Sequence, residues 1–404
     1  MLHRFKFLAC SFAFLCCVQG APTSSSSPSS PSNIPESIGR SSNCQNLTFT
    51  VTATAVNKVI PSPAATALST QDGVNAFYAS LPSLLASSTN QTRNGTYNLA
   101  AIYCLPHNHT HTNSSTSTTP LQILIHGSTY TKEYWDLGAW GTGPSSNSWT
   151  RFMNNAGYAT LAVDKLGNGA SSHPDPVYDV QLPLQMETIH SLITQLRSPD
   201  LSPIGQHKEY ILVGHSSGSI LAATLAQTHP DDISALILTG YPAGGSNNKG
   251  GIPSYHYLPA HLNPRFPPTL NPGYLLMNSE ANRTSAFYYA GHYDPQIPHL
   301  DFLTQGAQPL GEGFNLGPAT QPAFKGKVLV VTGTKDPAIC GFVPVDECAF
   351  NSTRIVGVNG SFGGNSGFDY YMPDTGHDLN WHYSAGETYG VVVGKVGGLL
   401  GGPG

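Results

Sequence analysis

The segment 210–227 constrains the fold more than any other part of this sequence. It begins with the apolar run Tyr-Ile-Leu-Val at 210–213, which has the length and composition of a buried strand. This run leads directly into Gly-His-Ser-Ser-Gly at 214–218, and a stretch rich in Ala and Leu with helical spacing follows at 219–227. A strand, a Gly-x-Ser-x-Gly turn and a helix in this order hold the central serine in a sharp turn with its hydroxyl exposed. The sequence therefore predicts that Ser216 is a nucleophile.

Apolar strand-like runs alternate with helical segments along much of the chain. Helical periodicity is clearest at 181–197, where Leu, Met and Ile recur every three or four positions, and a closing helix is expected from about residue 384. This alternation favours an α/β fold with a mostly parallel, doubly wound sheet that begins with an antiparallel pair. We expect the chemistry to lie beyond the carboxyl ends of the strands. The predicted strands are 49–60, 95–105, 121–125, 158–163, 210–213, 233–238, 327–331 and 368–372.

The alternation of strands and helices stops after the sixth predicted strand. The segment 241–324 is rich in Pro, Tyr and Gly, and we interpret it as a cap inserted into a core made of residues 44–240 and 325–404. Its many aromatic residues either line a pocket or form the interior of the cap, because aromatic side chains combine apolar walls with polar tips. Among them, Tyr288 and Tyr289 are the predicted substrate-binding residues.

The first twenty residues have the pattern of a secretory signal. A positively charged start is followed by an apolar run at 7–18 and by small or β-branched residues before position 21. The apolar run is short for a membrane span, so no stable membrane insertion is expected, although a retained anchor is the alternative interpretation. Residues 21–43 are rich in Ser, Pro and Thr and predict a disordered leader. The mature protein is therefore expected to be secreted and extracellular.

The cysteines fit this extracellular prediction. Three of the seven lie within the predicted signal, and an even number in a secreted chain indicates disulfides. Three pairings of the remaining four are possible. Cys340 and Cys348 would close a short loop and are the favoured pair, which leaves Cys44 for Cys104. Eight sequons also indicate a glycoprotein: Asn46, Asn90, Asn94, Asn108, Asn113, Asn282, Asn351 and Asn359.

The charge content argues against some classes of partner. Charged residues make up 10% of the 404 residues, against about 25% in a typical soluble protein, and the net charge is −5. Without a basic stripe, nucleic acid is not an expected partner. No cofactor or metal is expected, because C-x-x-C spacing is absent, and the alternating His107, His109 and His111 are interpreted as a solvated hairpin tip. The sequence does not indicate an oligomeric state.

Four motifs stand at positions that carry chemistry in a known superfamily: His126-Gly127, Gly-His-Ser-Ser-Gly at 214–218, Gly-Thr-Lys-Asp at 333–336 and Gly376-His377. Together they make the chain resemble the α/β-hydrolase superfamily over residues 46–403, in the group with a cap after the sixth strand. The pattern Asp-x-x-Gly-x-Gly-x-Ser at 164–171 also resembles secreted fungal members of esterase or lipase type. The resemblance implies the fold and a serine nucleophile, and it does not specify a substrate.

A serine nucleophile requires a base within hydrogen-bond reach and an acid that orients this base, and the resemblance implies the chain order Ser, acid, His. His377, in a loop after the last strand, is the predicted base. The competing His382 is interpreted as a packing or capping residue. Asp336 is the predicted acid, because it follows a strand and the preceding strand ends without a carboxylate; Asp346 is the weaker candidate. The predicted catalytic residues are therefore Ser216, Asp336 and His377.

An oxyanion hole requires two N–H donors. Ser217, at the start of the predicted helix, supplies one. The resemblance places the second donor in the loop after the third strand, at Gly127 or Ser128, with Ser128 favoured. His126 is interpreted as a buttress of this loop, and His215 as a packing residue.

The expected activity is the hydrolysis of a small-molecule carboxylic ester with fairly apolar groups. Epoxide hydrolases and haloalkane dehalogenases of the same superfamily need a carboxylate at the elbow, where this chain has serine. One alternative is a peptidase of the prolyl-aminopeptidase type, which needs acidic cap residues to hold an amine; Glu280, Asp294 and Asp301 are the acids at hand. The other alternative is a catalytically silent binding protein, since fold alone does not decide function.

Overall fold

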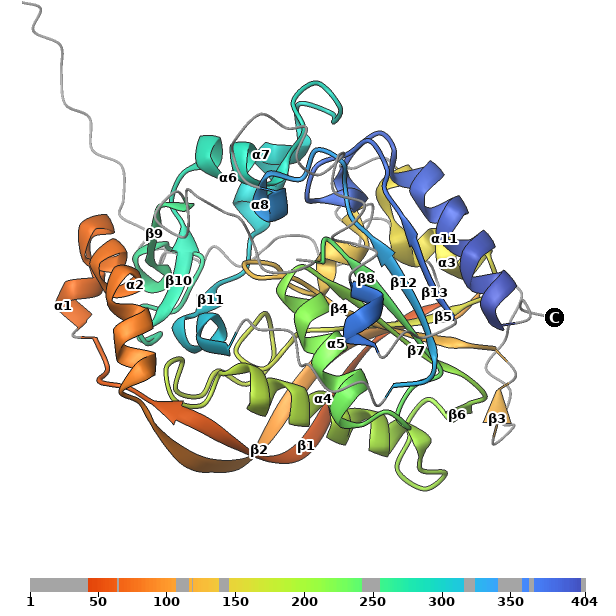
Figure 1. Ribbon diagram of the computed structural model, residues 1–404, viewed down its shortest axis with the longest axis horizontal. Helices are drawn as coiled ribbons and strands as arrows, with labels where there is room; N and C mark the ends of the chain where they lie inside the picture. The colour runs from red at the N-terminus through yellow and green to blue at the C-terminus, as the bar shows by residue number, and fades with distance from the viewer. Residues whose placement is uncertain are drawn as a thin grey trace, which may run out of the picture. The chain divides into compact units, whose positions relative to one another are not determined.

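An eight-stranded sheet forms the centre of the computed structural model (Figure 1). The model describes residues 43–63, 65–106, 116–117, 119–137, 145–241, 255–315, 324–340, 358–362 and 367–400, all within the unit Ser37–Gly404. The strands of the sheet are β1 (Cys44–Val59), β2 (Thr89–Cys104), β4 (Leu121–Ile125), β5 (Ala159–Val163), β7 (Tyr210–His215), β8 (Ala235–Thr239), β12 (Lys327–Val331) and β13 (Phe368–Tyr371).

The strand order is β1-β2-β5-β4-β7-β8-β12-β13. Strand β2 pairs antiparallel with both β1 and β5, and every pairing from β5 to β13 is parallel. The expected mostly parallel sheet with an antiparallel pair at its start is therefore confirmed. The first pair is longer than predicted, because both strands extend to 16 residues in continuous register.

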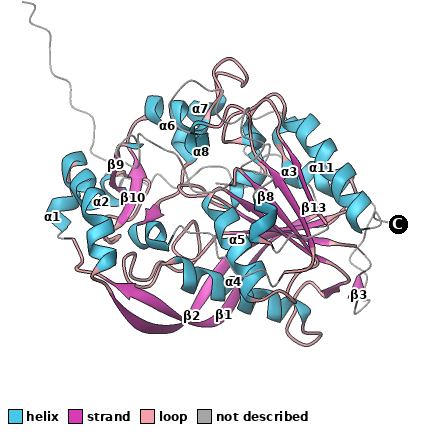
Figure 2. Ribbon diagram, viewed as in Figure 1, coloured by secondary structure: helices cyan, strands magenta, loops and turns pink. Residues whose placement is uncertain are grey.

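Helices cover both faces of the sheet (Figure 2). Side chains that alternate along a strand enter two different cores, as parallel sheets require. On β4, Ile123 belongs to a core shared with α4 (Leu182–Arg197) and α5 (Ser217–Thr228), whereas Leu124 belongs to a core shared with α3 (Trp149–Asn155) and α11 (Ala385–Leu400). The doubly wound arrangement is confirmed by this alternation. Among the described residues, none of the helices combines the length and the apolar character needed to cross a bilayer.

Between β8 and β12, the segment 255–315 forms a small sheet of its own with the order β11-β10-β9. Its strands have two to four residues, so they show no periodicity and were not predicted from the sequence. Residues 242–254 and 316–323 lie outside the described residues. The elements of this segment are β9 (Tyr257–Pro259), η5 (Ala260–Leu262), β10 (Tyr274–Met277), α6 (Glu280–Phe287), α7 (Ile297–Thr304), β11 (Gln308–Pro309) and η6 (Leu310–Asn315).

Two helices connect β1 to β2, α1 (Ala65–Leu68) and α2 (Gln71–Ala86), and neither was predicted from the sequence. Helix α2 lies beside β9 (Figure 1). Its Phe77 ring contacts Phe314 at a centroid distance of 6.4 Å, and Tyr78 contacts Tyr257 at 6.4 Å. The connection between β1 and β2 therefore packs against the segment 255–315. The shorter elements are β3 (Thr116–Ser117), η1 (Lys132–Trp135), η3 (Ser145–Asn147), β6 (Gln206–His207), α8 (Pro337–Cys340) and η7 (Leu379–Trp381).

A disulfide joins Cys44 to Cys104, the first residue of β1 and the last of β2. This predicted pair is confirmed. The other predicted pair cannot be compared, because Cys348 lies outside the described residues. Asn46, Asn90 and Asn94 are exposed on β1 and β2, Asn282 and Asn359 are half-buried, and the remaining sequons, Asn108, Asn113 and Asn351, lie outside the described residues.

The Cys44–Cys104 bond spans 60 residues, and closing a loop of this length in the unfolded chain predicts about 4 kcal/mol of stabilisation. We expect Cys44→Ser/Cys104→Ser to lower the free energy of unfolding by about this amount in urea titrations. Cys340→Ser/Cys348→Ser is the matched control: if the expected Cys340–Cys348 bond forms, its much shorter loop predicts a smaller loss of about 2.5 kcal/mol. Unchanged unfolding of the Cys44/Cys104 variant would contradict the prediction.

Candidate active site

The turn between β7 and α5 has the geometry that the sequence predicted for Ser216. This residue is half-buried and has φ 54° and ψ −121°, a backbone conformation that is strained for any residue other than glycine. A Cβ on Gly214 would lie 2.3 Å from the carbonyl oxygen of Gly218, and a Cβ on Gly218 would lie 2.4 Å from the carbonyl oxygen of His126. Because these obstacles are backbone atoms, both positions require glycine for the strand, the helix and the neighbouring loop to approach so closely.

Asp336 and His377 form a buried hydrogen-bonded pair. Nδ1 of His377 lies 2.8 Å from Oδ2 of Asp336, and each residue is only 1% exposed. The backbone N–H of Ile339 donates to the other carboxylate oxygen at 3.0 Å. Burial by itself would lower the pKa of His377, but the Asp336 carboxylate and its hydrogen bond outweigh burial and raise this pKa above its ordinary value.

Ser216 and His377 both adjoin the turn that follows β8. The backbone N–H of Ser216 donates to the carbonyl of Thr239 at 2.9 Å. A Cβ on the next residue, Gly240, would lie 3.0 Å from Cε1 of His377. The loops after β7, β12 and β13 therefore place the predicted nucleophile, acid and base around one turn at the carboxyl ends of the strands.

The loop that carries His377 is held by the segment 255–315. The carbonyl of Phe287, at the end of α6, accepts from the backbone N–H groups of His377 at 2.8 Å and of Asp378 at 3.2 Å. The Tyr130 hydroxyl donates to the Asp378 carboxylate at 2.6 Å. The position of the imidazole therefore depends on a part of the chain that lies outside the main sheet.

The competing His382 is fully engaged with backbone groups. Its Nδ1 lies 2.8 Å from the carbonyl of Asp378, so this nitrogen carries the proton and donates. Its Nε2 accepts from the N–H of Tyr289 at 2.9 Å and from that of Gly376 at 3.3 Å. Burial lowers the pKa of His382. With both nitrogens occupied, this side chain fixes the loop as a capping residue does. The other competitor, Asp346, lies outside the described residues.

Two further histidines near the nucleophile are buried, and burial holds the pKa of each well below its ordinary value. His126 connects two loops, since its Nδ1 lies 2.8 Å from the carbonyl of Gly127 and its Nε2 accepts from the N–H of Lys165 at 3.2 Å. The His215 ring stacks on Tyr134 at a centroid distance of 4.3 Å. Both arrangements agree with the roles expected for these residues, a loop buttress and a packing residue.

The predicted oxyanion-hole residues lie next to the nucleophile. A Cβ on Gly127 would lie 2.9 Å from Cβ of Ser216, so the loop after β4 passes directly beside the serine. Ser217 is the first residue of α5, where backbone N–H groups have no partner within the helix. The hydroxyls of Ser128 and Ser217 both donate to Oε1 of Glu312, at 3.2 Å and 2.7 Å. One carboxylate therefore ties together the side chains of both predicted donor residues.

This carboxylate and its cation were not predicted from the sequence. Glu312 lies in η6, and Lys165 follows β5; they are 3% and 1% exposed and form an ion pair. The Lys165 ammonium also donates to the Ser217 hydroxyl at 3.1 Å. Because 147 positions separate the two residues, no local pattern could have indicated the pair.

A second buried ion pair lies within the segment 255–315. The Arg283 guanidinium donates to both carboxylate oxygens of Asp301, at 2.7 Å and 2.5 Å, and to the Thr129 hydroxyl at 2.7 Å. The hydroxyl of the predicted substrate-binding Tyr288 donates to Asp301 at 3.0 Å, and this tyrosine is buried. Tyr289 is half-buried, and its ring stacks on His292 at 3.9 Å. The contacts of Tyr288 are those of an interior residue.

The Lys165–Glu312 pair predicts a large and asymmetric response to mutation. Glu312→Gln leaves the buried ammonium without its counter-charge, and we expect the free energy of unfolding to fall by about 3–5 kcal/mol in urea titrations. The matched control is Glu280→Gln in the exposed Glu280–His299 pair, which should cost less than about 1 kcal/mol. Lys165→Met/Glu312→Leu should recover much of the loss. Equal losses in Glu312→Gln and Glu280→Gln would contradict the prediction.

The chain matches the model of the alpha/beta hydrolase family over residues 122–389. It is 29% identical over 123 residues to epoxide hydrolase 3 of Xenopus tropicalis, covering 30% of this chain and 28% of that protein. It is 33% identical over 123 residues to the probable lysophospholipase BODYGUARD 1 of Arabidopsis thaliana, covering 30% of this chain and 22% of that protein. The chain thus matches less than a third of the length of either relative.

Among solved structures, the enol-lactonase from Burkholderia xenovorans LB400 superposes with a TM-score of 0.48 at 16% identity, over 74% of this chain and 94% of that one. A thermophilic esterase from Thermogutta terrifontis gives a TM-score of 0.47 at 16% identity, over 74% and 91%. The family model covers well over half of the sequence, and the strand order is that of a mostly parallel α/β sheet. This chain therefore belongs to the alpha/beta hydrolase family.

Proposed function

We propose that this protein is a serine hydrolase that cleaves carboxylic esters through Ser216, His377 and Asp336. The observation that carries the proposal is the buried hydrogen bond of 2.8 Å between His377 and Asp336, positioned beside a strained serine turn. A neutral serine hydroxyl is a weak nucleophile and needs a base that a third group orients, and this constellation provides both groups.

In the proposed mechanism, Nε2 of His377 removes the proton of the Ser216 hydroxyl while Oγ attacks the ester carbonyl carbon. Asp336 keeps Nδ1 protonated and stabilises the imidazolium that forms. The backbone N–H groups of Ser217 and Ser128 donate to the developing oxyanion. Collapse of the tetrahedral intermediate expels the alcohol, which takes the proton from Nε2. A water molecule, activated by the same imidazole, then hydrolyses the acyl-enzyme.

We further propose that the segment 241–324 is a cap that selects fairly apolar ester substrates. Its described part supplies Phe287, whose ring lies 5.5 Å from the His377 ring and whose carbonyl holds the histidine loop. One relative is named a probable lysophospholipase, and an apolar acyl ester as substrate is compatible with that name. Serine at the elbow supports ester cleavage over the epoxide chemistry that another relative's name states, since that chemistry requires a carboxylate at this position.

The peptidase alternative has less support. It requires an acidic cap residue that is available to a substrate amine, but the three acids considered for this role already have partners. Asp301 binds Arg283 at 2.5 Å, Glu280 lies 2.9 Å from His299, and Asp294 accepts from the backbone N–H of Gln296 at 2.9 Å. A comparison of aminoacyl amides with esters as substrates distinguishes the two activities.

We also propose that the protein is secreted and glycosylated, as the signal pattern of its first twenty residues and its eight sequons suggest. A disulfide between Cys44 and Cys104 supports an oxidising compartment. The exposed side chains of Asn46, Asn90 and Asn94 support glycan attachment on β1 and β2. Expression in a eukaryotic secretory host, followed by glycosidase treatment, should reduce the apparent mass; an unchanged mass would contradict glycosylation.

The proposed triad predicts an order of effects on kcat for a chromogenic ester. Ser216→Ala should abolish measurable turnover, and His377→Ala should do nearly the same, because nucleophile and base act as one unit. Asp336→Asn should lower kcat by about 10³–10⁴-fold, because the imidazole then adopts the wrong tautomer.

His382→Gln and Asp346→Asn are the matched controls for base and acid, and each should cost far less than its counterpart. An inactive Asp346→Asn beside a fully active Asp336→Asn would show that the acid is misassigned. Normal ester turnover by Ser216→Ala would refute the proposal as a whole, and faster cleavage of aminoacyl amides than of esters would favour the peptidase.

The raised pKa of His377 predicts the pH dependence of kcat/KM. The base must be neutral in the free enzyme, so the rate should rise with pH and reach half of its plateau above pH 6.5, the ordinary histidine value. In Asp336→Asn, the carboxylate that raises this pKa is gone while burial still lowers it, so the residual activity should titrate at lower pH. A wild-type midpoint below 6.5, or a midpoint that Asp336→Asn leaves unchanged, would contradict this assignment.

A further inference from the structure

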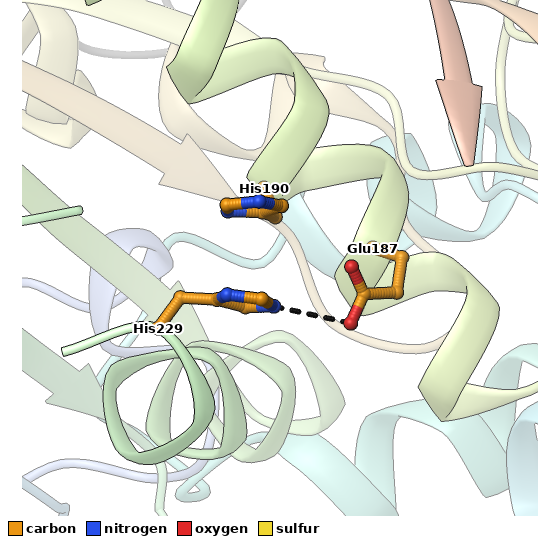
Figure 3. Close-up of side chains that lie close together, drawn as sticks. All are labelled: Glu187, His190 and His229. Atoms are coloured by element: carbon orange, nitrogen blue, oxygen red, sulfur yellow. Dashed lines mark hydrogen bonds and ion pairs between the residues drawn. The ribbon is translucent and has the colours of Figure 1, made fainter. Parts of the chain in front are cut away.

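Four titratable side chains gather at the end of α5 that lies away from Ser216. Glu187 and His190 are three positions apart on α4, His229 follows the last residue of α5, and Asp232 lies in the next turn. One possible ligand atom from each of Glu187, His190 and His229 lies within 4.8 Å of the other two. Figure 3 shows the two imidazoles one above the other with the Glu187 carboxylate beside them.

The contact of His190 with Asp232 leaves one imidazole nitrogen available. Nδ1 of His190 lies 2.7 Å from Oδ2 of Asp232. Because the carboxylate accepts, Nδ1 carries the proton, and in the neutral ring Nε2 presents its lone pair. Metal-binding histidines commonly donate the N–H of their other ring nitrogen to a carboxylate, which orients the ring and increases the basicity of the metal-binding nitrogen.

The contact of His229 with Glu187 has nearly the spacing of two metal ligands. Nε2 of His229 lies 3.1 Å from Oε1 of Glu187. In a tetrahedral site with bonds of about 2.0–2.1 Å, neighbouring ligand atoms are about 3.3 Å apart. A cation can therefore take the place of the proton between these two atoms. The carboxylates of Glu187 and Asp232 together balance the charge of a divalent ion.

The scaffold of this cluster is fixed, while its rings can turn. The Arg197 guanidinium on α4 donates to the carbonyls of Asp231 and Asp232 at 2.8 Å each, which ties the turn after α5 to α4. The His190 and His229 rings are stacked 3.7 Å apart and nearly parallel, at 9°. Imidazole lone pairs lie in the ring plane, so a shared cation requires one ring to tilt. Both histidines are half-buried, so neither ring is fully enclosed by the surrounding protein.

We propose that Glu187, His190 and His229 bind a divalent transition-metal ion, such as Zn²⁺, with Asp232 orienting His190 and a water molecule as fourth ligand. Two imidazoles and one carboxylate suit zinc and its neighbours better than Mg²⁺ or Ca²⁺, which prefer oxygen ligands. Helix α5 has 12 residues and is therefore about 18 Å long, which separates this ion from Ser216. The ion joins α4 to α5 and stabilises the fold without entering the ester chemistry.

This site differs from the metal possibility that the sequence suggested. The alternating histidines at 107–111 lie outside the described residues. Glu187-x-x-His190 is an unremarkable helical spacing, and His229 comes 39 positions after His190, so only the packing of α4 against α5 brings the three residues together. The two histidine sets can be separated by mutation.

The test is Zn²⁺ binding to chelator-treated full-length protein, by calorimetry and thermal unfolding. We expect one ion per chain and a rise in Tm on the order of a few degrees, with no comparable effect of Mg²⁺. His190→Gln and His229→Gln should each lose this binding, and Asp232→Asn should weaken it by about 10–100-fold.

Two controls address other histidines. His299→Gln, in an exposed histidine–glutamate pair with a separation of 2.9 Å, should keep wild-type affinity, and so should a variant with His107, His109 and His111 replaced by Gln. A further readout uses only the wild-type protein and so does not depend on whether the variants fold. Zn²⁺ should protect His190 and His229, but not His299, from modification by diethyl pyrocarbonate. No stoichiometric binding, or wild-type affinity in both His190→Gln and His229→Gln, would overturn the proposal.

Discussion

The contact between the turn at Ser216 and its neighbouring backbone is the constraint on which the site depends. Gly218 lies so close to the carbonyls at the end of β4 that a single added carbon would collide with them. This approach places the N-terminus of α5 against the loop that carries Gly127 and Ser128. It also holds Ser216 in a conformation that costs about 1–3 kcal/mol locally, and the surrounding eight-stranded sheet must offset this strain.

Buried polar contacts connect the segment 255–315 to this strained turn. The Glu312 carboxylate accepts hydrogen bonds from the hydroxyls of Ser128 and Ser217 and pairs with the Lys165 ammonium. The carbonyl of Phe287 accepts from the backbone N–H of His377. Breaking either contact would leave charged or polar groups buried without partners. The free-energy cost of such unpaired groups exceeds the net stabilisation that the intact contacts provide. The segment that we propose as a cap therefore also positions the groups proposed for catalysis.

The sequence predicted the features that arise from local patterns. The parallel strands have uninterrupted apolar runs because both faces of the sheet are covered, and the Gly-x-Ser-x-Gly turn identified the strained residue. Helix α2 was not predicted, although Val74, Phe77, Tyr78 and Leu81 have helical spacing after a Thr70 cap; Pro82 lies inside the helix. The short strands of 255–315 show no period. The Lys165–Glu312 pair depends on tertiary packing between distant segments and had no signal in the sequence.

The central claim is that Ser216 forms the acyl-enzyme. Its most direct measurement is mass spectrometry of peptides from protein treated with a fluorophosphonate, which reacts with activated serine hydroxyls and leaves unactivated ones unmodified. We predict one adduct per chain, located on Ser216 and absent from His377→Ala. Its rate of formation should rise with pH as His377 loses its proton. Labelling of another serine, or equal labelling of Ser216 when His377 is replaced, would contradict it.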